Sequence, residues 1–329
     1  MSIHAVKRAQ CHLAWDNSIS PALHVQSGDT VTFDCLDASN GQITSSSTVS
    51  SLHSLVFAQL DQVNGPVHVA GAAPGDTLRV DVLAAEPAEW GWTACIPGFG
   101  LLADEFPEPA LKIWSLHKHT AEGSQGGEGG GPVPGEYGYA WFDEARGIRI
   151  PLRPFAGEMG VAPAEPGAHS TIPPYRTGGN IDTRHLSVGS TLYLPVGVEG
   201  ALFSIGDGHA AQGDGEVCGT AIETPMKVTV RLTVLKDTPY VQTPHFSACN
   251  PHASTEEFYC TTGVGPDIRE ATRDAVRHMI AFLTAQHGLG RVEAYMLCSV
   301  AGDLRMHEVV DMPNYVIGLM LPKSVFTRG

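Results

Sequence analysis

The chain has 329 residues, enough for one large domain or two smaller ones. Its formal net charge of −15 argues against nucleic acid or an anionic membrane as a partner, and it suits a small neutral or cationic substrate. No run of about 18 apolar residues predicts a transmembrane helix, and the N-terminal residues lack the apolar stretch of a signal peptide.

The seven cysteines are scattered and form no C-x-x-C pattern. This usage is typical of reduced thiols in a cytosolic protein, so we expect a cytoplasmic location. The 37 glycines and 23 prolines indicate many turns. Together with the scarcity of helical patterns, they favour an all-β or α+β architecture, and we expect an α+β, mainly β class.

A recurring pattern in the first 200 residues is a glycine turn followed by alternating apolar positions. It begins at Gly28, Gly75 and Gly189. Repeated turn-to-strand transitions of this kind predict sheets packed face to face, as in a β-sandwich or jelly-roll-like body. We expect this β-rich body to cover residues 1–240.

Residues 90–135 contain two weaker candidate sites. Glu105 lies among apolar neighbours in an aromatic, turn-rich segment, where a carboxylate either faces a pocket or caps a turn. His117 and His119 form an H-x-H pair, which precedes a glycine-rich insertion at 122–135. A surface location is favoured for this pair, because a flexible insertion does not hold ligands in place.

Residues 151–186 are proline-rich and lead to Gly178-Gly-Asn-Ile-Asp. Asn180 and Asp182 are two residues apart, so they point the same way in an extended backbone. Asp182 and the nearby His185 are candidate metal ligands. The alternative is an Asx-turn before the strand that begins near residue 190.

The most informative stretch is Gly206-Asp-Gly-His-Ala-Ala-Gln-Gly-Asp-Gly-Glu. It lies between two strand patterns, and its glycines predict a flexible acidic loop. The pairs Asp207/His209 and Asp214/Glu216 each offer two ligands, or a ligand and a base, to one side. The spacing excludes an EF-hand, since Gln212 stands where glycine is required. The alternative is a turn whose polar residues cap backbone groups.

The C-terminal part, 241–329, is predicted to be a smaller α/β unit packed on the body. Residues 267–286 have one apolar stripe, a preceding Pro266 and a following Gly288, which predict a helix. The apolar run 292–300 indicates a buried strand or a short helix. Residues 305–310 and 316–321 have strand patterns.

Four of these segments resemble the acetamidase/formamidase family. They are the 206–216 stretch, Gly178-Gly-Asn-Ile-Asp, Gly160-Val-Ala-Pro-Ala and Ile96-Pro-Gly-Phe-Gly. The resemblance covers nearly the whole chain, and its formamidase-like branch fits better. It implies a hydrolase that cleaves short aliphatic amides, formamide or acetamide, to carboxylate and ammonia. It further implies a divalent metal, with zinc favoured over calcium and both left open, and a homodimer or higher homo-oligomer.

On this hypothesis, Asp182, Asp207 and His209 bind the metal and leave one position open. Glu216 is the first choice for the carboxylate that takes a proton from water and returns it to the leaving ammonia, with Asp214 and Glu105 as alternatives. The substrate amide is hydrogen-bonded by Asn180 or Gln212.

Two other functions remain open from the residues. One is an amidase with Cys218 as nucleophile, although lone cysteines are usually inert core residues. The other is a non-enzymatic, metal-stabilised binding module in which Asp207, Asp214 and Glu216 hold a structural ion.

Overall fold

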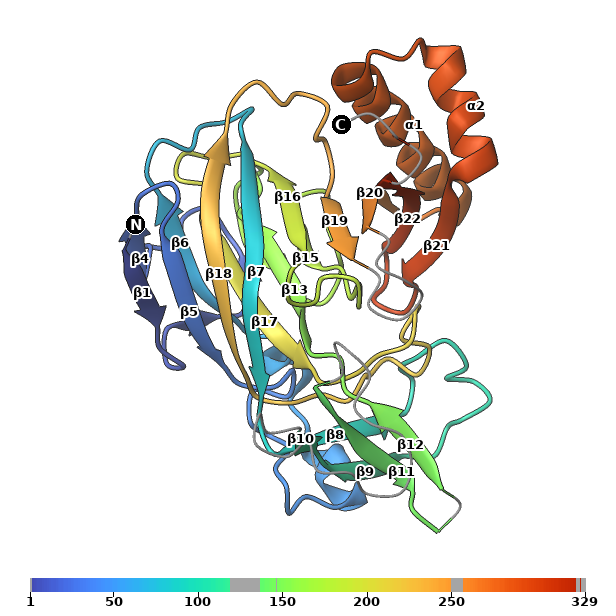
Figure 1. Cartoon of the computed structure of the whole chain (residues 1–329). Coiled ribbons are helices and arrows are strands. Elements are labelled where there is room, and N and C mark those ends of the chain that lie inside the picture. Colours follow the sequence, from blue (N-terminus) through green and yellow to red (C-terminus); the bar gives the residue numbers. More distant parts are fainter. Residues whose placement is uncertain (1, 119–136, 146, 250–256, 324–325, 327–329) are drawn as a thin grey trace, which may run out of the picture.

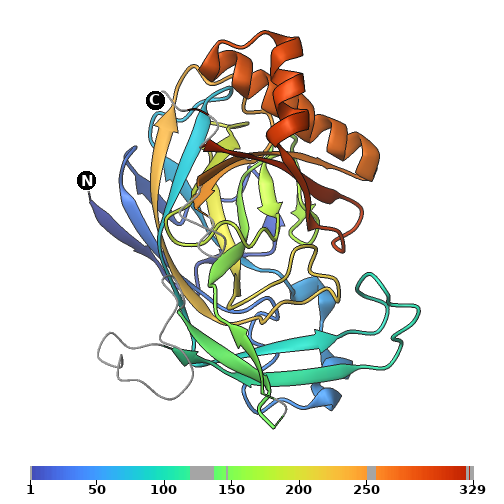
Figure 2. The same ribbon diagram turned by 45° about the vertical axis from the view of Figure 1, so that its right-hand side comes forward.

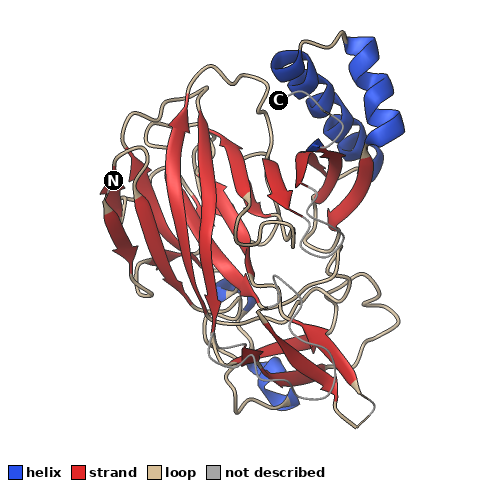
Figure 3. Ribbon diagram, in the orientation of Figure 1, coloured by secondary structure: helices blue, strands red, loops and turns tan. Residues whose placement is uncertain are grey.

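The computed structural model describes residues 2–118, 137–145, 147–249, 257–323 and 326, and strands dominate it (Figure 3). Within these residues, both α-helices lie in the C-terminal part of the chain. The expected α+β, mainly β class is confirmed. No helix among the described residues is long and apolar enough to cross a membrane.

The largest sheet has nine strands and runs through the whole molecule (Figure 1). In spatial order they are β1 (Ile3–Val6), β5 (Thr30–Cys35), β18 (Met226–Leu235), β7 (Thr77–Pro87), β16 (Thr191–Pro195), β19 (His245–Cys249), β20 (Glu257–Gly265), β22 (Tyr315–Pro322) and β21 (Asp303–Glu308). The sheet is continuous across position 240, since β16 pairs with β19 and places Tyr193 opposite His245. The division into units 1–240 and 241–329 therefore stays a prediction.

A second sheet carries the strands that matter for the site. Its order is β15 (Gly178–Asn180), β13 (Phe155–Val161), β17 (Phe203–His209), β6 (Val63–Val69) and β2 (Cys11–His12), with β4 (Leu23–Val25) beside β6. Buried side chains from both sheets form one core. Phe33 of β5 meets Phe203 of β17 edge-on at 5.9 Å, so the sheets pack face to face.

Short elements gather at one end of the long strands (Figure 1). They are the pair β8 (Trp90–Cys95) and β9 (Ala110–Ser115), the sheet β10 (His117–Lys118), β11 (Gly138–Asp143) and β12 (Ile148–Pro151), and the 3-10 helices η1 (Val49–Ser54) and η2 (Phe57–Gln59). A further small pair joins β3 (Ala14–Trp15) to β14 (His169–Ser170). The β8 and η2 regions form walls of the cavity described below.

The C-terminal helices pack against β20 and β22 (Figure 2). Helix α1 (Ile268–His287) is confirmed close to its expected bounds, and α2 (Arg291–Ala301) resolves the apolar run 292–300 as a helix. The Asp267 side chain accepts a hydrogen bond from Glu270 N at 2.8 Å, a cap worth about 1 kcal/mol. Gly288 ends α1 with φ 67°. The two expected C-terminal strands are β21 and β22.

One expectation about the 206–216 stretch is wrong. Its first four residues belong to β17, and every residue of that strand is buried. The glycines that suggested a flexible loop instead allow close packing, because a Cβ on Gly206 or Gly208 would collide with the backbone of a neighbouring segment. Only the residues after His209 leave the sheet.

Candidate active site

Three predicted metal ligands converge at the end of β17. Asp207 and His209 lie on that strand, and Asp182 follows β15 on the far side of β13. Gly157 of β13 lies between them. A side chain there would collide with Asp207 Oδ2 and Asp182 Oδ1 and would lie 2.9 Å from His209 Cε1. The missing Cβ of Gly157 is therefore what lets the two carboxylates and the imidazole approach one another.

The His209 ring is held by contacts at both nitrogens. Its Nδ1 lies 2.8 Å from Gln212 Oε1, and the Gln212 amide nitrogen donates to the Asp182 carbonyl at 2.6 Å. Because that second bond turns the Gln212 oxygen toward the ring, Nδ1 carries the hydrogen and donates it. This leaves Nε2 to face the carboxylates, at 2.9 Å from Asp207 Oδ2. The arrangement is typical of an outer-shell residue that fixes a metal-binding histidine.

Two further carboxylates face the same nitrogen. His209 Nε2 lies 3.1 Å from Glu223 Oε2 and 3.7 Å from Glu216 Oε1. A fifth carboxylate, Asp311, offers an oxygen within 4.8 Å of both Asp182 and Glu216. The site is thus larger than the sequence predicted, since neither Glu223 nor Asp311 was among the candidates.

The crowding of buried acids changes their proton affinity. Burial, with the charge of Asp207, raises the pKa of Asp182 well above its usual range, and burial beside Asp182 does the same for the pKa of Glu216. Burial raises the pKa of Glu223 to about 7. Burial alone would lower the pKa of His209, but the carboxylates of Asp207 and Glu223 hold it well above its usual value. Without another cation, protons must neutralise this cluster.

Three of these residues have a strained backbone. Asp182, Asp207 and Glu216 have φ values of 39°, 52° and 43°. This left-handed region is unfavourable for residues other than glycine, and each instance costs on the order of 1–3 kcal/mol. Such strain persists where the surrounding structure fixes it, and it is concentrated at functional sites.

The cluster opens into a small cavity of about 40 Å³. Its polar lining includes Asp61, Asn180, Asp207, His209, Glu216, Glu223 and Asp311. Its apolar lining includes Leu55, Phe57, Leu60, Trp92, Ile96, Phe99 and Ile172. Trp92 is fixed by a hydrogen bond from its indole nitrogen to the buried Asp37 at 3.0 Å. A space lined by both acidic and apolar side chains suits a small neutral molecule with a polar end.

Glu216 also lines a second, larger space of about 370 Å³. Its other lining residues include Trp114, Phe142, Arg153, Arg184 and Gln212. Glu216 therefore stands where the small cavity meets the more open one. That position suits a group that exchanges protons with a molecule in the small cavity.

The cluster around His209, which we call the inner cluster, fits a divalent cation. Both oxygens of Asp182, Oδ1 of Asp207 and Oε2 of Glu223 are buried without a hydrogen-bond partner. Leaving such oxygens unpaired is costly unless a cation or protons satisfy them. The donor set of one imidazole and several carboxylates is one that zinc and related metals accept. No described lysine or arginine pairs with these carboxylates.

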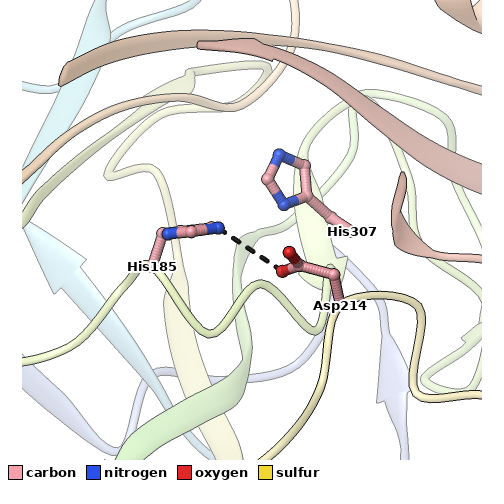
Figure 4. Close-up of side chains that lie close together, drawn as sticks. All are labelled: His185, Asp214 and His307. Carbon is pink, nitrogen blue, oxygen red and sulfur yellow. Dashed lines mark ion pairs between the residues drawn. The ribbon is translucent and has the colours of Figure 1, made fainter. Parts of the chain in front are cut away.

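A second histidine–aspartate cluster lies nearby and is differently built. His185, Asp214 and His307 place potential ligand atoms within 4.8 Å of one another, with His185 Nε2 at 3.4 Å from Asp214 Oδ1 (Figure 4). However, Arg184 and Arg305 pair with Asp214 at 3.2 and 3.4 Å. With two guanidinium groups on its only carboxylate, this cluster is a poor dication site, and it serves as an anchor instead.

The remaining predicted residues have other partners. The Asn180 amide nitrogen donates to Asp311 Oδ2 and to the Ile172 carbonyl, so it positions a carboxylate. Asp214 has a pKa below its usual range, because His185 and Arg184 outweigh the effect of its burial. Glu105 is exposed and does not line the cavity that holds His209. His119 lies outside the described residues, and His117 stacks on Tyr139.

The alternative nucleophile Cys218 has no activating base among its described contacts. Its thiol donates to the Thr220 carbonyl at 3.3 Å and lies 3.7 Å from the Thr220 hydroxyl. A nucleophilic cysteine needs a neighbouring histidine or another group that favours the thiolate. The geometry does not favour this reading.

The missed residues are close to His209 only through the fold. Residues 221–224 pair with 208–211, which places Glu223 opposite His209. Asp311 follows β21 and reaches the site through Asn180. The one sequence signal was a lone acid within an apolar run, as in Ala221-Ile-Glu-Thr-Pro and Val309-Val-Asp-Met-Pro. Acidic side chains are almost never fully buried unless they are paired.

Fold and site together define an enzyme with a buried acid–base cavity for a small molecule. The model of the Acetamidase/Formamidase family matches residues 2–167 and 164–328. The chain is 26% identical to a formamidase of Methylophilus methylotrophus, over 96% of this chain and 89% of that protein. It is 31% identical to an acetamidase of Mycolicibacterium smegmatis, over 68% and 66%. An acetamidase structure from Bacillus halodurans superposes with a TM-score of 0.82 at 29% identity, covering 98% of both chains.

The chain therefore belongs to the acetamidase/formamidase family, as the resemblance of its motifs indicated. The family membership and the relatives make it an amidase that acts on short amides.

Proposed function

We propose that the chain hydrolyses formamide, and acetamide less well, to the carboxylate and ammonia in a metal-dependent reaction at the His209 cavity. The observation that carries this proposal is the combination of a cavity of about 40 Å³ with a crowded, partly unpaired set of carboxylates. The relatives named formamidase and acetamidase support the same chemistry.

The volume of the cavity favours the smallest amides. One water needs roughly 10–15 Å³ of such space, so about 40 Å³ takes about three water-sized groups. Formamide has three non-hydrogen atoms and acetamide has four. The polar end of the amide faces Glu216 and Glu223, and the hydrogen or methyl group of the acyl end faces the apolar lining.

Asp182, Asp207 and His209 are the residues we expect to hold the metal, with Glu223 beside them. The Nε2 lone pair of His209 favours zinc over calcium, which prefers oxygen ligands only. A divalent metal supplies positive charge that polarises an amide carbonyl and makes water a stronger acid. Because the same charge replaces the protons that otherwise neutralise the cluster, binding of the metal releases protons.

Glu216 is the proposed proton carrier. Its burial makes the carboxylate more basic than in water, which favours removal of a proton from the attacking water. The carbonyl carbon gains the water oxygen, and the proton on Glu216 then passes to the amide nitrogen as the carbon–nitrogen bond breaks. The products are the carboxylic acid and ammonia. Gln212 contributes by fixing the His209 ring rather than by contacting the substrate.

A homo-oligomeric, cytoplasmic enzyme remains part of the proposal. It is supported by the family resemblance and by the scattered cysteines, of which Cys11, Cys35, Cys95, Cys218, Cys260 and Cys298 are free thiols. Light scattering during size-exclusion chromatography measures the number of subunits.

The test is ammonia release from formamide and acetamide, with metal content determined on the same sample before and after chelation. We expect turnover that is lost on complete chelation and restored by one divalent metal, with formamide as the better substrate. Turnover that survives metal removal would contradict the metal mechanism and point to Cys218. Absence of turnover on both amides, in protein with bound metal, would favour the binding module.

A further inference from the structure

We infer that Phe99 separates the reaction cavity from an apolar pocket and thereby limits the length of the acyl group that this amidase accepts. The inference rests on the proposed amide hydrolysis and extends it to a residue that sets specificity. Removal of the ring is expected to convert an enzyme for the smallest amides into one for linear alkyl amides.

The position of Phe99 between two spaces carries the argument. It lines the cavity of about 40 Å³ that holds His209 and Glu216, and it lines a separate pocket of about 390 Å³. Among the described residues, Phe99 is the one that the two linings share. A side chain that forms a wall of both spaces is the barrier between them.

The ring is held in this position by its surroundings. The Phe99 amide donates to the Ile96 carbonyl at 3.0 Å, which closes a turn after β8. On the other side, a Cβ on Gly219 would lie 2.5 Å from two Phe99 ring atoms, so glycine is required for the ring to pack there. Gly219 in turn donates to the Glu216 carbonyl at 2.7 Å. Phe99 therefore packs against the turn that carries the proposed proton carrier.

The larger pocket has the chemistry of an alkyl-binding site. Its lining is almost wholly apolar and includes Leu101, Leu102, Phe106 and Val217, with no charged residue. These four side chains are between 47% and 60% exposed. An alkyl chain lying on them would remove apolar surface from water at about 25 cal/mol per Å². The pocket thus has a favourable interaction to offer, but Phe99 separates it from the cavity of about 40 Å³.

The small cavity and the apolar pocket predict opposite effects of acyl-chain length on kcat/KM. In the unaltered enzyme the acyl chain points away from Glu216 toward Phe99, and each added methylene must fit a cavity that about three small groups fill, so activity falls from formamide to longer amides. In Phe99→Ala the chain passes into the apolar pocket. Each buried methylene is then worth roughly fourfold in kcat/KM. The reaction itself is unchanged, since the same carbon–nitrogen bond is hydrolysed.

The experiment measures kcat/KM for formamide, acetamide, butyramide and hexanamide in the metal-containing enzyme and two variants. For Phe99→Ala we expect the hexanamide-to-formamide ratio to rise at least about tenfold over the unaltered enzyme. The matched control is Phe106→Ala, which enlarges the same apolar pocket but leaves the barrier in place. It should keep the original order of substrates.

The outcomes separate this inference from the proposed function. If the unaltered enzyme releases no ammonia from any amide, the proposed function fails first. If it hydrolyses formamide while Phe99→Ala keeps the original hexanamide-to-formamide ratio, Phe99 is not the barrier. Equal shifts of this ratio in Phe99→Ala and Phe106→Ala would also overturn the inference. Melting temperature checks the fold of each variant. Should Phe99→Ala not fold, Phe99→Leu must still shift the ratio toward butyramide, or the inference fails.

Discussion

Two histidine–aspartate clusters lie in the described part of the chain, and their difference is instructive. In the inner cluster, Asp182, Asp207 and His209 converge. In the outer cluster, His185 and His307 lie close to Asp214. Both bring potential ligand atoms within 4.8 Å of one another. By residue type and distance alone, the second cluster with its two imidazoles is the more conventional metal site.

Charge balance separates the two clusters. The inner cluster has several buried carboxylates, one imidazole and four carboxylate oxygens without a hydrogen-bond partner. In the outer cluster, Arg184 and Arg305 already neutralise Asp214, and the Thr183 hydroxyl lies 2.8 Å from His307 Nδ1. A dication stabilises the first and is repelled from the second. Unpaired charge, rather than proximity of ligand types, marks the candidate metal site.

The outer cluster instead fixes the segment that carries Glu216. The Gly215 amide donates to the His307 carbonyl at 3.0 Å, and Arg305 of β21 pairs with Asp214. The C-terminal strands are thereby joined to the active-site segment. On the proposed function, the cluster around His209 carries the chemistry, and the cluster around Asp214 holds the Glu216 segment in position.

The largest expected effect is the contrast between two variants, each of which removes one histidine from one of the clusters. His209→Ala should lower kcat/KM by at least about 10³-fold and abolish stoichiometric metal binding, because it removes the imidazole ligand. His185→Ala should cost less than about tenfold and leave the metal in place. Steady-state kinetics on formamide and elemental analysis measure both.

Equal losses of activity and metal in the two histidine variants would contradict the distinction between the clusters. Circular dichroism of His209→Ala adds a second criterion. A variant that is folded but inactive supports a catalytic metal, whereas an unfolded variant supports an ion with a structural role.

A smaller contrast is expected between two acids that are two residues apart. Glu216→Gln should lower kcat by roughly 10²- to 10⁴-fold with little change in KM, since it removes the proton carrier but keeps the shape. Asp214→Asn should lower kcat by less than about tenfold. Its partners are partly exposed, so its loss should reduce the free energy of unfolding by on the order of 1 kcal/mol.

The two acid variants also test the choice of base. Asp214 was an alternative to Glu216 in the sequence, and its location among two arginines and a histidine argues against that role. A loss of kcat in Asp214→Asn that matches Glu216→Gln would restore it as a candidate. Chemical denaturation of both variants shows whether stability accounts for any difference.

The fold was predictable where local patterns decide it. Helix α1 has a cap at Asp267, an apolar stripe and a stop at Gly288, all within one segment. The last four residues of β17, from Gly206 to His209, were mistaken for a loop because glycine-rich sequences usually form loops. Here glycine is required because neighbouring backbones approach Gly206 and Gly208 closely, which depends on residues far away in the sequence.

The site, too, was predictable only where local geometry brings its residues together. Asp207 and His209 are two residues apart on one strand, so their common direction follows from local geometry. Glu223 meets His209 through pairing of two segments, and Asp311 comes from beyond β21, so no local pattern relates them. Gln212 was expected to bind substrate, but its amide is engaged by His209 and the Asp182 backbone.

The smallest expected effect concerns the buried Glu308. It follows His307, and its Oε1 accepts hydrogen bonds from the amides of Val310 and Asp311, the latter at 2.6 Å. Burial raises its pKa to about 7. In the folded, metal-free protein it therefore keeps its proton up to about pH 7, whereas in the unfolded chain it loses the proton near the ordinary value of 4.5.

The sign of the pH effect follows from this difference in bound protons. Between about pH 5 and pH 7 the native state binds the proton and the unfolded state does not, so the free energy of unfolding falls as pH rises. One such group contributes up to about 1.4 kcal/mol per pH unit. Glu308→Gln should make the slope shallower by that amount in chelated protein.

The exposed Glu257 has a pKa lowered by Lys323, so Glu257→Gln should leave the slope unchanged in this interval. Urea denaturation at several pH values measures these slopes, and an unchanged slope in Glu308→Gln would mean that other carboxylates of the inner cluster carry the buried protons.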